Sequence, residues 1–115
     1  MKKTDYLELA RLAAHLAEDK KGSDIVILNV KRLTVVANYF LIVTVESWAQ
    51  MKAVLDAIEE SVREQEGVKP LRREGTKHGT WSVLDYGGLV VHVMMPEART
   101  LYALERVWGE AKKIK

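Results

Sequence analysis

The chain contains no cysteine among its 115 residues. This absence excludes disulfides, thiolate metal sites and cysteine nucleophiles. Long apolar runs are also missing, and none approaches the roughly 20 residues that a membrane-spanning helix needs. The first residues, Met-Lys-Lys-Thr-Asp, are charged and lack the apolar segment of a secretory signal. From these absences we expect a cytoplasmic protein.

A strong charge of either sign is lacking as well. The 18 Lys and Arg residues nearly balance the 16 Asp and Glu residues, which leaves a formal net charge of +2. Such a charge is too small to predict binding to nucleic acid by itself. One short segment is more basic, with Lys69, Arg72, Arg73 and Lys77 set against Glu74. This segment is a candidate contact with RNA phosphates, although a solvated loop has the same composition.

The length and the hydrophobic content of 48% are those of one globular domain spanning residues 1–115. Small apolar side chains at helical spacing predict a helix over residues 4–18. Two β-branched apolar runs, over 24–30 and 39–45, are typical of strands covered on both faces. We therefore expect the chain to open with a helix and two buried strands.

The second predicted helix has the clearest boundaries. Ser47 suits its N-cap, and Gly67 suits the position just after its last turn. Its apolar side chains recur at intervals of three and four, so they should form one stripe facing the core. The residues of that stripe are Trp48, Met51, Leu55, Ile58 and Val62.

The C-terminal half predicts a short edge strand, a hairpin and a final helix. A short strand is expected near 69–73, and Pro70 predicts that it lies at an edge of the sheet, because proline cannot donate a ladder hydrogen bond. The hairpin turns at Gly87-Gly88, and the final helix runs from Pro96 to about Lys112. The order α-β-β-α-β-β-β-α predicts an α/β fold, with a single mixed β-sheet of about five strands flanked by helices.

Polar residues interrupt the apolar hairpin. One of its sides is almost wholly apolar and belongs in the core, whereas the other holds Trp81, Asp85 and His92. Asp85 and His92 lie diagonally across the two strands, so we expect them to form a structural polar pair. The register that a two-residue turn predicts pairs Tyr86 with Leu89, Leu84 with Val91 and Ser82 with Val93.

A carboxylate beside an imidazole can act as a general base, so catalysis is one interpretation of Asp85 and His92. The chain nevertheless offers no convincing nucleophile, no metal-ligand spacing, no Asp-x-Asp pair and no Gly-rich phosphate loop. We therefore predict no enzyme activity, no catalytic residue, no metal site and no cofactor.

The final predicted helix adds residues suited to an interface. Tyr102 is displaced from the apolar row of this helix and is expected at the surface, whereas Trp108 belongs to the row and to the core. Glu105 can pair with Arg99 or with Arg106 in a helical salt bridge. Surface aromatics beside charged groups are typical of protein interfaces.

Two stretches carry a resemblance to a known family. They are Trp81-x-x-x-Asp85-Tyr86-Gly87-x-x-Val90-Val91-His92-Val93-Met94 and Arg99-x-x-Tyr102-x-Leu104-Glu105-x-x-Trp108-Gly109. Together they resemble the signature of the ribosomal silencing factor family, also called Iojap or RsfS. Upstream, Asp24-Ile-Val-x-Leu-x-Val30 and Ala37-Asn-Tyr-Phe-x-Ile-x-Thr44 resemble its first two strands. Gly88 departs from the pattern, because the family usually carries Asp at this point of the turn.

The resemblance implies a ribosome-associated factor that is not an enzyme. Family members bind the large ribosomal subunit through its fourteenth large-subunit protein, on the face that meets the small subunit. They thereby block subunit joining sterically and repress translation, and a role in ribosome biogenesis is also associated with them. The implied fold is nucleotidyltransferase-like without the catalytic carboxylates, and members of the family can form homodimers.

Within this interpretation, Trp81 is the expected aromatic anchor, while Asp85 and Glu105 offer charge complementary to a basic ribosomal protein. The partner-binding residues that we expect are Trp81, Asp85, Tyr86, Arg99, Tyr102 and Glu105. Two alternatives stay open. One is a nucleotidyltransferase-like enzyme, which needs two carboxylates converging on a metal. The other is an RNA-binding large-subunit assembly factor that uses the basic segment from Lys69 to Lys77.

Overall fold

The computed structural model describes residues 4–75 and 79–115 of the chain. Within these residues a mixed sheet of six strands forms in the spatial order β3-β4-β5-β2-β1-β6. Strands β2 and β5 run parallel, and the other neighbouring pairs are antiparallel. The strands are β1 (Ser23–Asn29), β2 (Tyr39–Thr44), β3 (Arg72–Gly75), β4 (Trp81–Asp85), β5 (Leu89–Met94) and β6 (Lys112–Lys113).

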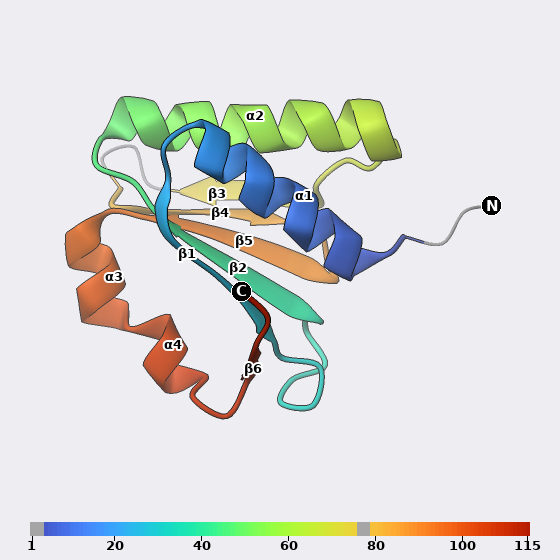
Figure 1. The fold of residues 1–115 in the computed structure, drawn as a ribbon, viewed down its shortest axis with the longest axis vertical. Coiled ribbons are helices and arrows are strands. Elements are labelled where there is room, and N and C mark those ends of the chain that lie inside the picture. Colours follow the sequence, from blue (N-terminus) through green and yellow to red (C-terminus); the bar gives the residue numbers. More distant parts are fainter. Residues whose placement is uncertain (1–3, 76–78) are drawn as a thin grey trace.

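Helices lie on both faces of this sheet (Figure 1). One face carries the two long helices, α1 (Tyr6–Asp19) and α2 (Trp48–Glu66). The other face carries two short consecutive helices, α3 (Pro96–Tyr102) and α4 (Leu104–Val107). The predicted α/β class, with one mixed sheet flanked by helices, is therefore confirmed. No helix within the two described ranges has the length and the hydropathy needed to cross a bilayer.

The strand number differs from the expected five because of β6. Its two residues pair antiparallel with β1, Lys113 opposite Leu28 and Lys112 opposite Asn29. Both lysines are exposed, so no apolar alternation marks this strand in the sequence. This pairing places the segment before β6 next to the loop that leaves β1.

Both long helices begin at a side-chain N-cap, and α2 also ends at a capping glycine. At the start of α1, the Asp5 carboxylate accepts a hydrogen bond from the N–H of Glu8 (3.2 Å). At the start of α2, Ser47 Oγ accepts one from the N–H of Gln50 (3.0 Å). Gly67 follows α2 with a φ of 67°, a left-handed conformation that glycine adopts without steric cost. The predicted Ser47 cap and Gly67 terminus are confirmed.

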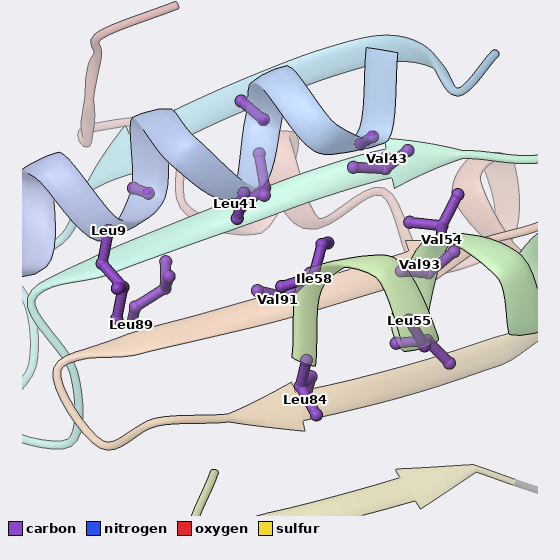
Figure 2. Packing of buried hydrophobic residues seen from close by; sticks show 14 of the residues in the cluster. Leu9, Leu41, Val43, Val54, Leu55, Ile58, Leu84, Leu89, Val91 and Val93 are labelled. Carbon is purple, nitrogen blue, oxygen red and sulfur yellow. The ribbon is translucent and has the colours of Figure 1, made fainter. Parts of the chain in front are cut away.

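The main core lies between the two long helices and the sheet. Figure 2 shows Leu9 of α1 beside Leu89 and Ile58 of α2 beside Val91, all within this buried cluster. Helix α1 can approach the sheet closely because its buried face is built mainly from alanine. The buried alanines are Ala10, Ala13, Ala14 and Ala17.

The predicted apolar stripe of α2 is confirmed for its later residues but is wrong for Trp48. Met51, Leu55, Ile58 and Val62 are buried, whereas Trp48 is 53% exposed. Trp48 is the first residue of the helix, at one end of the stripe, where it lines an open hollow of about 260 Å³. A stripe is enclosed only where the sheet extends beneath it, so periodicity overestimates burial at a helix end.

The hairpin of β4 and β5 has the predicted register. Ser82 pairs with Val93 and Leu84 with Val91, and the N–H of Tyr86 donates to the carbonyl of Leu89 (2.8 Å). One side of the hairpin belongs to the main core. The other side belongs to a second, smaller core under α3 and α4. The expected division of the hairpin into two faces is therefore confirmed.

The single final helix expected from Pro96 to Lys112 is wrong. Helix α3 stops at Tyr102, because Ala103 has φ 43° and ψ 54°, in the left-handed region. Helix α4 then follows as a single turn, and the chain continues into β6. Alanine has the highest helix propensity of all residues, so nothing in the local sequence predicts a break at this position.

Candidate protein-docking site

The face of the sheet that carries α3 and α4 remains partly open at β4. Along this strand Ser82 and Leu84 are buried, whereas Trp81, Val83 and Asp85 are only half-buried. Successive side chains of a strand point to opposite faces. The buried row therefore faces α2, where Ser82 Oγ contacts Met51 Sδ (3.1 Å), and the half-buried row lies on the open face.

Trp81 and Tyr102 form the aromatic centre of this open region. Their ring centroids lie 4.6 Å apart with an interplanar angle of 45°, within the range of favourable aromatic pairs. Tyr102 is 47% exposed, and Leu101 before it is 75% exposed. An aromatic pair and an aliphatic side chain are thus accessible at the end of α3.

His92, which we expected to pair with Asp85, instead orients the indole of Trp81. Trp81 Nε1 donates a hydrogen bond to His92 Nδ1 (3.1 Å), so Nδ1 is unprotonated and the neutral imidazole carries its proton on Nε2. His92 is 8% exposed, and its ring meets that of Phe40 edge-on, with centroids 5.1 Å apart. Burial lowers the pKa of His92 to about 4, while the charge of Asp85 opposes this shift. At neutral pH His92 is therefore an uncharged acceptor.

The expected polar pair between Asp85 and His92 is wrong. Asp85 Oδ1 accepts a hydrogen bond from the N–H of Gly87 (2.7 Å) within the turn. Its Oδ2 lies 3.7 Å from Nε of Arg72 on the edge strand β3. An aspartate two residues before a turn N–H is well placed to satisfy that donor, and the indole of Trp81 occupies Nδ1 of His92 instead.

Arg99 and Glu105 form a bidentate salt bridge on this face. Arg99 Nε and Nη2 donate to the two carboxylate oxygens of Glu105 (2.8 and 3.0 Å). Arg99 Nη1 also donates to Thr44 Oγ1 at the end of β2 (2.8 Å). Hydrogen bonds from Arg99 lower the pKa of Glu105. Of the two expected partners for Glu105, Arg99 is the one that the structure gives, rather than Arg106.

Tyr86 does not lie with the other expected partner-binding residues. Its side chain is 3% exposed and belongs to the main core under α1 and α2, on the opposite face of the sheet. Burial raises the pKa of its hydroxyl. Trp81, Asp85, Arg99, Tyr102 and Glu105 lie on the open face or at its rim, whereas Tyr86 cannot reach a partner there.

The arginines of the basic segment are engaged by carboxylates. Arg73 Nη1 lies 2.8 Å from an oxygen of Asp56 and 3.5 Å from one of Glu59 on α2. Arg72 lies between Glu74 (3.5 Å) and Asp85 (3.7 Å). Hydrogen bonds from Lys52 and Arg73 lower the pKa of Asp56. Two of the four cations proposed for RNA binding therefore have carboxylates beside them.

Of the other two cations of that segment, the structure describes only Lys69. Lys69 is exposed, and Lys77 lies outside the residues that the structure describes. Sequence reasoning also missed Leu101 as an accessible apolar residue and His92 as the group that orients Trp81. A polar residue in an apolar row marked His92, but neither its partner nor the helix break at Ala103 was visible in a local pattern.

The site offers an aromatic pair, an aliphatic side chain and carboxylates at its rim. These are groups that bind protein surfaces through desolvated aromatic anchors surrounded by polar contacts. Over residues 4–75 and 79–115, no group of three His, Asp or Glu side chains is placed to hold a metal ion.

Comparison with known proteins adds a family assignment. The family model described as "Ribosomal silencing factor during starvation" matches residues 3–115. "Ribosomal silencing factor RsfS" from Halalkalibacterium halodurans is 36% identical over 107 residues, which are 93% of this chain and 91% of that protein. "Protein Iojap, chloroplastic" from Zea mays is 34% identical over 96% of this chain and 47% of its own length.

A mouse protein and a solved bacterial structure are also similar to this chain. "Mitochondrial assembly of ribosomal large subunit protein 1" from Mus musculus is 43% identical over 35 residues, covering 30% of this chain and 15% of that protein. A crystal structure of a protein from Chromobacterium violaceum superposes with a TM-score of 0.86 at 35% identity. It covers 92% of this chain and 88% of that one.

Proposed function

The chain belongs to the family of ribosomal silencing factors, and from this premise we propose that it binds the large ribosomal subunit in the cytoplasm. The partner that we propose is the fourteenth large-subunit protein, on the face that meets the small subunit. A domain bound there blocks subunit joining sterically and represses translation. The observation that carries this proposal is the accessible Trp81–Tyr102 pair on the open face of the sheet.

The chemistry of the open face suits a basic protein partner. The Trp81–Tyr102 pair provides the kind of aromatic anchor that dominates binding energy in protein interfaces. Glu105 has a side chain that is 41% exposed, and Asp85 lies at the same face, so both carboxylates offer complementary charge. Steric exclusion needs no chemical step, because a bound domain competes with any other surface for the same patch.

Arg99 is a positioning residue in this proposal rather than a contact. Its side chain is only 12% exposed, and its hydrogen bonds go to Glu105 and Thr44. By joining α4 to the end of β2, Arg99 fixes the place of Glu105 and of the segment that carries Tyr102. Loss of Arg99 should therefore weaken binding by misplacing the docking surface.

The proposal is tested by sedimentation of purified large subunits with Tyr102→Ala and Trp48→Ala variants. Tyr102 is half-exposed and Trp48 is an exposed aromatic of α2 on the other face, so each variant removes one surface aromatic. Tyr102→Ala should reduce co-sedimentation with the large subunit and restore subunit joining, whereas Trp48→Ala should do neither. Equal binding by both variants and the unmodified chain would refute the site.

Large-subunit assembly is a second candidate function, supported by the name of the mouse relative. It predicts that deleting the gene leaves immature large subunits, whereas silencing alone predicts normal subunits that join too readily under starvation.

The nucleotidyltransferase-like alternative predicts nucleotide binding, which isothermal titration would detect. The homodimer remains a prediction that light scattering of the purified protein would test.

A further inference from the structure

A second surface, built where β1 and β6 meet, gathers cations that are distant in the sequence. The antiparallel pairing of Asn29 with Lys112 places the loop after β1 beside the segment that leads into β6 (Figure 1). Between them lies a hollow of about 630 Å³. We call it the basic hollow, and its lining residues are Asn29, Lys31, Arg32, Leu33, Glu110 and Lys112.

The cations of the basic hollow are available to a ligand. Lys31, Arg32 and Lys112 are exposed, and among the ion pairs found in the described part of the chain none involves them. Glu110 is the single carboxylate among the lining residues. Arg72 and Arg73 differ from the cations of the basic hollow, because carboxylates lie beside both arginines. These carboxylates belong to Asp56, Glu59, Glu74 and Asp85. Two arginines of the basic run thus have carboxylates beside them, whereas the exposed cations of the basic hollow make no ion pair within the described residues.

Two contacts give the loop of the basic hollow a defined shape. The side-chain oxygen of Asn29 accepts a hydrogen bond from the N–H of Lys31 (3.1 Å), which is the turn-forming contact typical of asparagine. Lys31 Nζ lies 5.0 Å from the centre of the Tyr39 ring, a cation–π distance. The backbone of the loop is thereby held beside β1, while the Lys31 ammonium lies near Tyr39, which does not itself line the basic hollow.

The basic hollow is continuous with the helix pair that carries the docking site. Leu33 lines the basic hollow and also an adjoining one, together with Arg106, Val107 and Trp108. Trp108 in turn packs edge-on against Phe40 of the sheet, with ring centroids 5.1 Å apart. A particle seated on the Trp81–Tyr102 pair can therefore extend past α4 and reach the basic hollow.

We propose that the basic hollow binds the phosphodiester backbone of structured RNA that flanks the docking site on the large subunit. This inference rests on the proposed function, which supplies an RNA-rich particle as the partner. Several cations around an open hollow suit a ligand with regularly repeated negative charges, and Lys and Arg contact phosphates without reading sequence. Each neutralised phosphate releases counterions, so this contact must appear in the salt dependence of binding.

The test compares an Arg32→Gln/Lys112→Gln variant with a control that removes the same two charges elsewhere, Arg63→Gln/Lys69→Gln. Arg63 and Lys69 are exposed cations on the α2 side, and Lys69 belongs to the segment first considered for RNA. Affinity for purified large subunits is measured across a series of salt concentrations. The Arg32→Gln/Lys112→Gln variant should lose several-fold in affinity at low salt. Its salt slope should fall by about 0.7–0.9 for each phosphate contact removed.

The outcomes separate this inference from the function on which it rests. If the unmodified chain binds large subunits and both variants bind with its affinity and slope, the basic hollow has no role while the docking proposal stands. If the control variant loses as much as the test variant, the effect is one of overall charge and the inference is wrong. Failure of the unmodified chain to bind large subunits at all would overturn both.

A photo-crosslinker distinguishes RNA from an acidic protein at the basic hollow. The probe is p-benzoylphenylalanine in place of Leu33, which is 39% exposed at the rim. After irradiation of the complex with the large subunit, a ribonuclease-sensitive adduct supports the inference. An adduct that contains only ribosomal protein would assign the basic hollow to an acidic protein segment and overturn it.

Discussion

Arg99 and Glu105 join two short helices across a break in the chain. Their bidentate contact, with distances of 2.8 and 3.0 Å, spans six positions. In a continuous α-helix, side chains six residues apart point to different faces, since 3.6 residues make one turn. The contact forms because Ala103 turns the chain through a left-handed conformation. The same guanidinium reaches Thr44, so one side chain links α3, α4 and β2.

The first prediction concerns the stability that Arg99 provides. Arg99→Ala should lower the free energy of unfolding by about 1–3 kcal/mol, because three hydrogen bonds of a largely buried cation are lost. The matched variant Arg106→Ala removes an exposed arginine from α4 and should change stability by less than about 0.5 kcal/mol. Urea denaturation at neutral pH measures both. Similar losses for the two variants would show that the Arg99–Glu105 contact contributes little.

The second prediction concerns His92 and pH. The pKa of His92 is about 4 in the folded chain, against an ordinary value of 6.5. Between these values the unfolded chain binds a proton that the folded chain does not. The free energy of unfolding should therefore be fully retained above pH 6.5 and should decline as the pH falls towards 4. The maximum slope of this contribution is about 1.4 kcal/mol per pH unit.

A His92→Gln variant tests the source of this pH dependence. Glutamine does not titrate, and its side-chain oxygen can accept the hydrogen bond of Trp81 Nε1. Denaturation midpoints measured from pH 4.5 to 7.5 should depend less on pH in the variant than in the unmodified chain. Parallel pH profiles would show that other groups cause the loss of stability.

The elements that could be predicted from the sequence are those whose signals lie within a few residues of one another. The stripe and caps of α2 depend on residues three or four apart and on Ser47 and Gly67, so they are visible in the sequence. The hairpin register followed from the two-residue turn, which fixes the side to which Trp81 and His92 point. For the same reason the division of this segment between two faces was predictable.

Long-range contacts decided the features that local patterns could not predict. Ala103 adopts a left-handed conformation although alanine favours helix, and the contacts of Arg99 to Thr44 and Glu105 stabilise the resulting bend. Arg73 pairs with Asp56, a partner seventeen residues earlier in the chain. The basic hollow exists only because β6 pairs with β1. Each of these features needs the folded arrangement of segments that are far apart in the sequence.

The third prediction concerns Gly88 in the hairpin turn. A Cβ at this position would overlap the ring of Tyr6 at the start of α1. The Gly88 carbonyl also accepts hydrogen bonds from the N–H groups of Asn38 and Tyr39 (both 2.9 Å), so the backbone there cannot shift freely. Gly88→Asp should therefore cost about 1–3 kcal/mol of stability.

A double variant shows whether Tyr6 is the cause. In the Tyr6→Ala background the overlap is removed, so Gly88→Asp should cost clearly less there than in the unmodified chain. This difference is a coupling energy that a double-mutant cycle of urea denaturation curves measures directly. Additive losses would mean that position 88 disfavours Asp for a reason unrelated to the Tyr6 ring.

The fourth prediction concerns the helix break itself. Ala103 has a φ of 43°, which is unfavourable for a residue with a Cβ and free of that cost for glycine. Ala103→Gly should therefore raise the free energy of unfolding by up to about 1 kcal/mol, after allowance for the greater freedom of glycine in the unfolded chain. Ala57→Gly in the middle of α2 is the matched control and should lower it by about 1 kcal/mol. The two substitutions are chemically identical, so opposite signs in urea denaturation can arise only from their backbone conformations. Equal destabilisation by both would indicate that Ala103 is helical and that α3 and α4 form one continuous helix after all.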